Sequence, residues 1–218
     1  MDNEKRKNIY CRLYIVRHVE TEWNVKKLFQ GHSDSPLTTK GIGQAKNLHD
    51  KLSEINFSAV YSSDMLRTKR TAEIIMIDKK IAVQTTKALR ERCFGPFEGK
   101  GPKAETYDQF INMIKDQKQL LEYAQLHPEY KTVETDEQIM GRYITFLREI
   151  SVAYASKKVL VVSSGGIMRV FLTHIGWGTK EELPSRCVQN MAITQIDCDG
   201  VDFFVRKVEG VNKRIALP

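Results

Sequence analysis

The sequence predicts an α/β fold, a three-layer sandwich in which helices flank a mainly parallel sheet, with a helical cap inserted late in the chain. Two observations predict it. Short apolar runs rich in β-branched residues, over 13–16 and 158–163, are typical of buried strands. Segments with apolar residues at helical spacing alternate with such runs, as in folds with a parallel sheet. With 218 residues, the chain is expected to form one domain over 1–218 that carries the insertion.

The first half of the chain supplies three strands and two helices. A strand over 11–18 is followed by apolar residues at three- and four-residue spacing over 45–55, which predict a helix that covers the sheet. A second strand is expected over 59–63, followed by a helix over 67–75. A third strand begins at 81–83.

The pattern changes between about 101 and 153. Two helical stretches flank a polar kink at His127-Pro128, and this segment contains no convincing strand. We therefore expect a helical cap insertion over 101–153 that lies above the sheet.

The last third of the chain returns to strands. Residues 158–163 predict the clearest buried strand, which runs into a serine and two glycines at 164–166 and then a helix over 167–175. Two further strands are expected around 191–197 and 201–208, joined by a hairpin turn. These late edge strands could pair between subunits, which would produce a homodimer.

Composition and charge limit the classes of partner. Lys and Arg outnumber Asp and Glu by 34 to 27, and a net charge of +7 suits either nucleic acid or a small anionic substrate. No basic run is interleaved with aromatic residues, so we expect no nucleic-acid partner. No apolar run is long enough to cross a membrane, and none follows the amino terminus as a signal peptide would need. Four scattered cysteines without metal-ligand or redox spacing predict a reduced, cytoplasmic chain.

Polar residues follow several predicted strands at the point where each strand ends. Arg17 and His18 end the first strand, and Arg67 lies one turn into the helix after the second. Glu91 follows the third strand, and a helix begins beside Ser164. Because ligands of open α/β sheets bind outside the carboxyl ends of the strands, these groups could converge. Together they suit a phosphomonoester: the arginines hold its free oxygens, the histidine attacks phosphorus and the carboxyl group protonates the leaving oxygen.

Each of these residues also has a simpler interpretation. Arg17 and His18 could be a surface pair that merely ends a strand, and a two-residue motif is weak on its own. Arg67 could be a solvated helix charge. Glu91 could be a surface carboxylate that pairs with a neighbouring arginine. The surrounding sequence decides between these interpretations.

Residues 17–24, Arg-His-Val-Glu-Thr-Glu-Trp-Asn, resemble the Arg-His-Gly-Glu-Thr signature of the histidine phosphatase superfamily. The resemblance is to its phosphatase branch, beside the cofactor-dependent phosphoglycerate mutases. It continues, in the same order and at similar spacing, through residues 30–38, 62–68, 89–99 and 161–166. These blocks extend over nearly the whole chain.

The resemblance implies a role for each matching residue. His18 would be the nucleophile that forms a phosphohistidine, Arg17 and Arg67 would clamp the phosphoryl group, and Glu91 would donate a proton. It also implies a small phosphorylated metabolite or inorganic phosphate as ligand, with no cofactor and no metal. The residues expected to line the phosphate pocket are Asn24, Gln30, Gly31, Ser164, Gly165 and Asn190, of which Asn190 could equally be an ordinary residue at the start of a strand.

The chain departs from the family pattern at two positions. Ser164 stands where the family has its second catalytic histidine, and neither His32 nor His174 replaces it in register. Loss of one preorganised donor to the reacting group typically costs about 10²–10³ in rate, so we expect weak phosphate binding and slow turnover. Val19 replaces the glycine of the signature, and a stiff side chain beside the nucleophile could shift His18 or narrow the site.

Three functions are therefore compared. The first is a phosphatase that acts on a small phosphomonoester through His18, with reduced activity. The second is a non-catalytic pseudo-phosphatase that binds phosphoryl ligands, for which Ser164 is the reason. The third is phosphoglycerate mutase activity, which the short segment after Glu91 disfavours. Natural divergence and a deliberate substitution would both account for Ser164, and the sequence leaves the two open.

Overall fold

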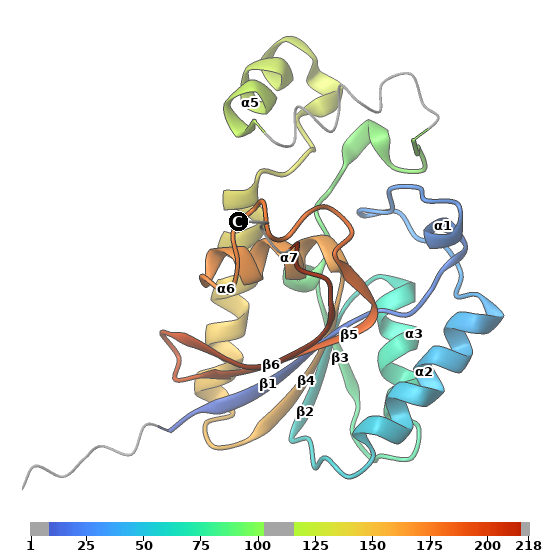
Figure 1. Ribbon diagram of the computed structural model, residues 1–218, viewed down its shortest axis with the longest axis vertical. Coiled ribbons are helices and arrows are strands. Elements are labelled where there is room, and N and C mark those ends of the chain that lie inside the picture. The colour runs from blue at the N-terminus through green and yellow to red at the C-terminus, as the bar shows by residue number, and fades with distance from the viewer. Residues whose placement is uncertain (1–8, 103–115, 215–218) are drawn as a thin grey trace, which may run out of the picture.

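A six-stranded sheet forms the centre of the structure, a computed structural model that describes residues 9–102 and 116–214 (Figure 1). The strands are β1 Cys11–Arg17, β2 Ala59–Ser63, β3 Val83–Thr86, β4 Lys158–Ser163, β5 Val188–Cys198 and β6 Phe203–Val211. They lie in the order β3-β2-β4-β1-β5-β6. The first four of these pair in parallel, whereas β5 is antiparallel to both of its neighbours. The predicted mainly parallel sheet is confirmed.

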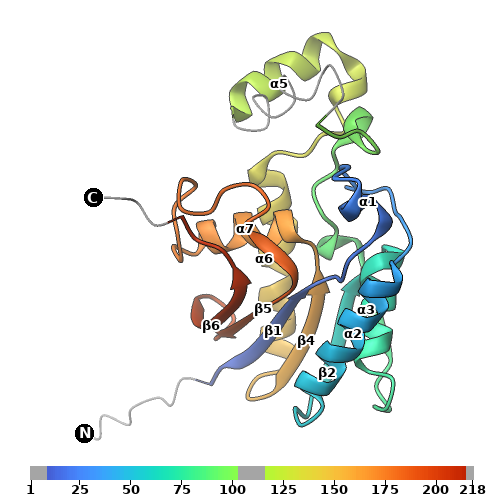
Figure 2. The same ribbon diagram turned by 45° about the vertical axis from the view of Figure 1, so that its right-hand side comes forward.

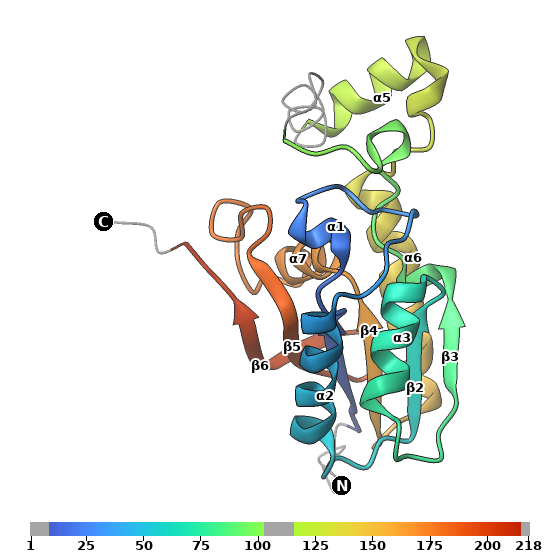
Figure 3. The same ribbon diagram turned by 90° about the vertical axis from the view of Figure 1, so that its right-hand side faces the viewer.

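Helices cover both faces of the sheet. Helices α2 Thr39–Leu52 and α3 Leu66–Ile75 lie on one face, and α6 Asp136–Ala153 and α7 Gly165–His174 lie on the other (Figures 1 and 3). The side chains of β1 alternate accordingly: Leu13 and Ile15 pack in the core under α6 and α7, and Tyr14 and Val16 pack in the core under α2 and α3. The three-layer sandwich is therefore confirmed. A strand covered on both faces needs apolar residues throughout, which explains the continuous apolar runs of β1 and β4.

The predicted cap contains two different parts. Helix α5 Gln117–Leu126 and the short 3₁₀ helix η3 Pro128–Tyr130 stand apart from the sheet, where Leu120 and Val133 form a small apolar cluster with Phe97 (Figure 2). In contrast, α6 is a covering helix, because Tyr143 and Leu147 are fully buried in the core beside the sheet. The expected cap over 101–153 is thus corrected at its carboxyl end: an amphipathic helix shows that one face is buried, but not which surface buries it. Residues 103–115 of the expected cap lie outside the described residues.

Short elements complete the described part of the chain. They are α1 Glu22–Val25 and the 3₁₀ helices η1 Lys87–Leu89 and η2 Gly95–Phe97. Strand β5 begins three residues earlier than expected, and an irregularity between Val188 and Ile193 interrupts its pairing with β6. Among the described helices, none is both long and apolar enough to span a membrane.

Candidate active site

The carboxyl ends of β1 and β4 create the site. These neighbouring strands pair in register up to Arg17 and Ser163, and the His18 amide continues the ladder by donating to the Ser163 carbonyl at 3.0 Å. The next residue of each chain segment, His18 and Ser164, therefore emerges at the same edge. A cleft of about 800 Å³ opens there, and its lining includes Arg17, His18, Arg67, Glu91 and Ser164.

His18 is held as a neutral imidazole. Its burial, together with the nearby guanidinium groups of Arg67 and Arg17, keeps the pKa of His18 well below its usual value. Its Nδ1 lies 2.8 Å from the Val19 carbonyl oxygen, which can only accept, so Nδ1 carries the proton. The Nε2 atom consequently keeps its lone pair. Such an imidazole is ready to act as a nucleophile.

Arg67 is fixed by backbone and side-chain acceptors. Its Nη1 donates to the Ser33 carbonyl at 2.7 Å and to Asp34 at 3.0 Å, and its Nη2 donates to the Gly31 carbonyl at 2.7 Å. Only 1% of Arg67 is exposed. The long side chain therefore has little freedom, and its guanidinium group is preorganised in the wall of the cleft.

Arg17 is the last residue of β1, and its guanidinium group lies between β5 and the start of α7. Its Nη1 donates to the Val188 carbonyl at 2.5 Å, and burial lowers the pKa of Arg17 to about 10, which leaves it charged at neutral pH. A Cβ atom on Gly165 would lie 2.9 Å from Arg17 Nε. Glycine at this position lets the guanidinium group approach the backbone at the helix amino terminus.

Four buried polar atoms of the cleft lack a protein partner among the described residues. They are Arg17 Nε, Arg67 Nε, Gln30 Oε1 and Ser164 Oγ. Buried polar groups in folded proteins nearly always have a hydrogen-bond partner. Three of these four atoms can donate, so the arrangement suits a ligand that presents several acceptor oxygens.

Glu91 lies at the amino terminus of α7. Its Oε2 accepts from the Gly166 amide at 2.7 Å and its Oε1 accepts from the Arg92 amide at 2.8 Å. The arginines beside it have other partners, because Arg90 pairs with Asp64 and the Arg92 guanidinium group pairs with Asp136. The interpretation of Glu91 as a surface carboxylate in a pair with its neighbours is therefore wrong.

The remaining expected residues divide into two groups. Asn24, Gln30, Gly31 and Gly165 line the cleft with the residues above. Asn190 is not among the lining residues, and its Nδ2 donates instead to the His18 carbonyl at 2.9 Å and to Asn24 Oδ1 at 3.2 Å. The expected place of Asn190 in the lining is therefore corrected: Asn190 holds the backbone of His18 and the side chain of Asn24, which does line the cleft.

A comparison with known families decides the assignment. The family model described as the histidine phosphatase superfamily (branch 1) matches residues 13–209. The chain belongs to this superfamily. It is 30% identical to the Uncharacterized phosphatase PhoE of Bacillus subtilis over 84% of this chain and 86% of that protein. It is 29% identical to the Adenosylcobalamin/alpha-ribazole phosphatase of Escherichia coli over 75% and 78%. The crystal structure of a phosphoglycerate mutase from Bacillus anthracis superposes with a TM-score of 0.78 at 26% identity, over 94% of this chain and 96% of that one.

Ser164 directly follows β4, at the position for which the sequence resemblance implies a second histidine. It occupies the position before the first turn of α7, but its hydroxyl group caps no amide of the helix. The side chain is buried and faces the cleft without a partner among the described residues. A hydroxyl group therefore faces the cleft at the position for which the resemblance implies an imidazole.

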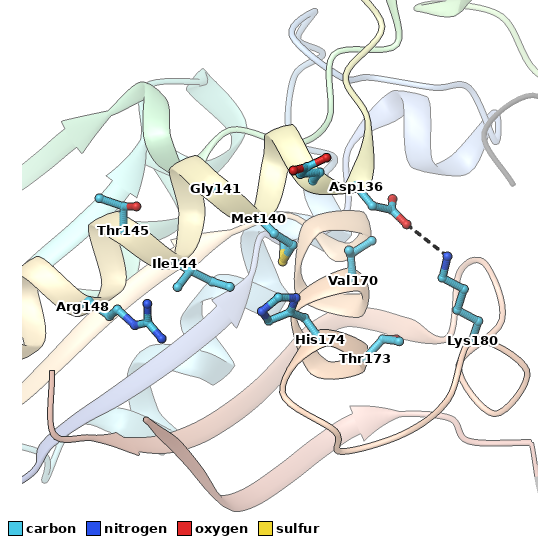
Figure 4. A pocket seen from close by; sticks show the side chains of 11 residues that line it. Asp136, Met140, Gly141, Ile144, Thr145, Arg148, Val170, Thr173, His174 and Lys180 are labelled. Atoms are coloured by element: carbon cyan, nitrogen blue, oxygen red, sulfur yellow. Dashed lines mark ion pairs between the residues drawn. The ribbon is translucent and has the colours of Figure 1, made fainter. Parts of the chain in front are cut away.

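No other histidine of the described residues takes that position. His32 Nε2 lies 3.1 Å from the Glu91 carbonyl oxygen and 3.7 Å from Glu134, and His32 does not line the cleft. His174 lies at the far end of α7 and lines an adjoining groove of about 560 Å³ between α6 and α7, not the cleft itself (Figure 4). Among the described residues, His18 is the histidine that lines the cleft.

Val19, the second position at which the sequence differs from the signature, packs into the core. Val19 is fully buried in the cluster under α2 and α3, and its amide donates to Thr71 Oγ1 at 3.3 Å. It is not one of the described non-glycine residues with positive φ, so this backbone position does not require glycine. The expected narrowing of the site is not seen, because Val19 is not among the residues that line the cleft.

The structure adds cationic residues that the motifs did not indicate. Arg92, Arg169, Lys180, Arg186 and Arg214 also line the cleft. Arg169 could have been found, since it lies four residues after Gly165 and thus on the same face of α7. Arg186 and Arg214 lie outside regular elements or at their ends, where periodicity gives no signal. Among the described residues, no three His, Cys, Asp or Glu side chains gather as a metal site.

Proposed function

We propose that this histidine phosphatase hydrolyses a small phosphomonoester through a phosphohistidine at His18, with turnover reduced by Ser164. One observation carries the proposal. The neutral His18 keeps a free Nε2 beside two guanidinium groups whose Nε donors have no partner among the described residues. A nucleophile and unused anion donors at one point suit a phosphoryl group.

The reaction proceeds in two displacements. The phosphoryl group lies between Arg17 and Arg67, which neutralise its free oxygens, and His18 Nε2 attacks phosphorus. The P–N bond forms as the P–O bond to the leaving group breaks, and Glu91 in its acid form gives that oxygen a proton. A water molecule then gives its proton to Glu91 and attacks phosphorus. The P–N bond breaks, inorganic phosphate leaves, and His18 is again neutral.

Ser164 weakens the charge stabilisation of both steps. Its hydroxyl group can donate one hydrogen bond, but it is short and carries no positive charge. Loss of a preorganised donor of this kind costs about 10²–10³ in rate. The residual activity then depends on the two arginines and the amino terminus of α7.

Ser164 also favours a second candidate, a pseudo-phosphatase that binds phosphoryl ligands without turnover. Both candidates bind the phosphoryl group through the same residues of the cleft, so a binding measurement alone does not separate them. Release of phosphate does. Mutase activity is distinguished by supplying 3-phosphoglycerate with and without its bisphosphate primer.

The decisive experiment compares the original chain with His18→Ala and Ser164→His. Release of inorganic phosphate from an aryl phosphate is measured for all three, with the melting temperature as a control for folding. We expect slow release by the original chain, none above background by His18→Ala, and a rise of about 10²–10³ in kcat for Ser164→His. Release by Ser164→His alone would favour the pseudo-phosphatase. If none of the three chains releases phosphate from aryl phosphate or from phosphorylated metabolites, the proposed phosphatase activity is contradicted.

A further inference from the structure

The arginines of the described residues differ in their partners. Seven of them form an ion pair with a carboxylate: Arg12, Arg67, Arg70, Arg90, Arg92, Arg142 and Arg206. Five described arginines form no such pair, and four of these line the catalytic cleft: Arg17, Arg169, Arg186 and Arg214. Arg17 belongs to the phosphoryl site. The other three have no role in the reaction described above.

These three arginines reach the cleft from different segments. Arg169 lies on α7, where its Nη1 is 3.4 Å from the Leu183 carbonyl oxygen. Arg186 lies before β5, and its Nη2 donates to the Lys27 carbonyl at 3.2 Å. Arg214 follows β6 and is held through its backbone amide. A guanidinium group has five N–H donors, so each of the three side chains keeps most of its donors for a ligand.

Arg169 and Arg186 extend the positive charge of the phosphoryl site, and Arg214 lines the same cleft. The pKa of Arg17 is lowered mainly by burial, and the charge of Arg186 contributes to this shift. The pKa of the Cys187 thiol is raised by burial, and the charges of Arg169 and Arg17 both oppose that increase. Carboxylates only partly offset this charge. Asp136 already pairs with Arg92 and Lys180, as Figure 4 shows for the lysine. Glu91 accepts from two backbone amides, and Glu181 lies on the rim and is exposed, as are Arg186 and Arg214.

Arg186 is also held in an unusual backbone conformation. Its φ is 67°, in the left-handed region that side chains other than glycine and asparagine seldom adopt. The amide of the next residue, Cys187, donates to the Pro184 carbonyl at 3.2 Å and closes the turn. The turn thus holds the Arg186 side chain at the wall of the cleft, beside the strand whose Val188 carbonyl anchors Arg17.

We propose that Arg169, Arg186 and Arg214 form a subsite for a second anionic group of the substrate. The inference rests on the proposed function and specifies its substrate class: a phosphomonoester that also carries a carboxylate or a second phosphate. The phosphoryl group to be transferred lies at His18, and the second anion lies in the outer cleft. A planar guanidinium fork matches the oxygens of either anion.

The test measures binding by calorimetry, which does not require turnover. The original chain is titrated with 3-phosphoglycerate and with glycerol 3-phosphate, which has a hydroxymethyl group in place of the carboxylate. Propane-1,3-diol bisphosphate and its monophosphate form the second pair. We expect at least about tenfold tighter binding of the ligand with the extra anion, since a hydrogen bond to a charged group is worth that factor or more. The pair with the larger ratio identifies carboxylate or phosphate as the preferred group.

Variants connect the preference to the subsite. Arg186→Gln and Arg169→Gln should each reduce the ratio of the two affinities about tenfold, and Arg169→Lys serves where the glutamine variant fails to fold. Arg148→Gln is the matched control, because Arg148 also has no carboxylate partner among the described residues but lines the adjoining groove of Figure 4 and not the cleft. It should leave the ratio unchanged.

Two results would overturn the subsite. One is equal affinity for both members of each pair in the original chain. The other is a preference that survives in the Arg186 and Arg169 variants. Hydrolysis of aryl phosphate is followed in parallel. If aryl phosphate is hydrolysed but no preference exists, the proposed function stands and the subsite is wrong. If no hydrolysis occurs but the preference is found and lost in the variants, the subsite stands and the phosphatase is wrong.

Discussion

The imidazole of His18 is buried and flanked by two guanidinium groups, and both conditions disfavour its charged form. In the folded chain it stays neutral at pH values where a histidine of the unfolded chain, with a pKa of about 6.5, takes up a proton. The unfolded state then binds more protons, so folding stability is lost as the pH falls below about 6.5. Between about pH 7.5 and 5.5, we expect the original chain to lose more stability than His18→Gln, measured as the urea midpoint.

An equal loss in both chains would show that His18 titrates normally, and the inference of a neutral His18 would then be wrong. His32 also has a lowered pKa, chiefly through burial, but it is present in both chains and cancels in the comparison. Titration of the imidazole signals by nuclear magnetic resonance provides an independent check.

The cleft-lining residues found from the sequence share one property. Arg17, His18 and Ser164 directly follow or end strands, so the topology of a parallel sheet brings them to one edge. Asn190 was misplaced because it precedes Met191, whose φ of 67° marks an irregular stretch of β5 that redirects side chains. Arg186 was missed because a loop residue reaches the cleft through tertiary contacts alone.

The amino terminus of α7 lies beside the carboxyl ends of β1 and β4, and its Gly166 amide donates to the Glu91 carboxylate. A Cβ atom on Gly166 would lie 2.6 Å from Glu91 Oε1, so Gly166→Ala must displace Glu91 or the helix. We expect kcat/KM to fall by about tenfold or more, because in the proposed reaction a displaced Glu91 loses its alignment with the leaving oxygen. The measurement is phosphate release by the variant, with circular dichroism to confirm folding.

Helix α6 offers the matched control for a glycine in a helix. A Cβ atom on Gly141 would meet no other described part of the chain within 4 Å, so Gly141→Ala extends into open space. It should raise the free energy of unfolding by about 0.5–1 kcal/mol without changing kcat/KM. Unchanged activity in Gly166→Ala would show that Glu91 does not depend on this close approach.

Elements differed in how well the sequence predicted them. The bounds of β2 and β4 match the expected ranges. Strand β4 is apolar from Val159 to Val162, as a strand buried on both faces requires, whereas β2 begins with apolar residues and ends in two buried serines. Helix α6 was expected in the cap, because its apolar face carries no information about whether a sheet or a loop lies beneath it. The first three residues of β5 were not predicted as strand, because Gln189 and Asn190 are polar and the pairing with β6 is irregular there.

At the scale of the whole molecule, charge and topology act together. The chain carries a net charge of +7, and the carboxyl ends of its parallel strands bring Arg17 and the helix amino terminus of α7 into one cleft. Arginines and lysine outnumber carboxylates in the lining of the cleft, and an excess of one sign of charge raises the local concentration of oppositely charged ligands. Screening by salt weakens this effect, since the Debye length shortens to about 10 Å at 0.1 M.

The KM for a dianionic phosphomonoester should therefore rise severalfold when sodium chloride is raised from about 20 to 200 mM, with a smaller change in kcat. Arg186→Gln should reduce this salt dependence because it removes a charge from the cleft wall. Lys46→Gln is the control: Lys46 is exposed on α2, away from the cleft, and its loss changes the net charge by the same amount. An equal salt dependence of KM in both variants would assign the effect to the net charge of the protein. A reduced salt dependence in Arg186→Gln alone would assign it to the local field of the cleft, which attracts the substrate before it reaches His18.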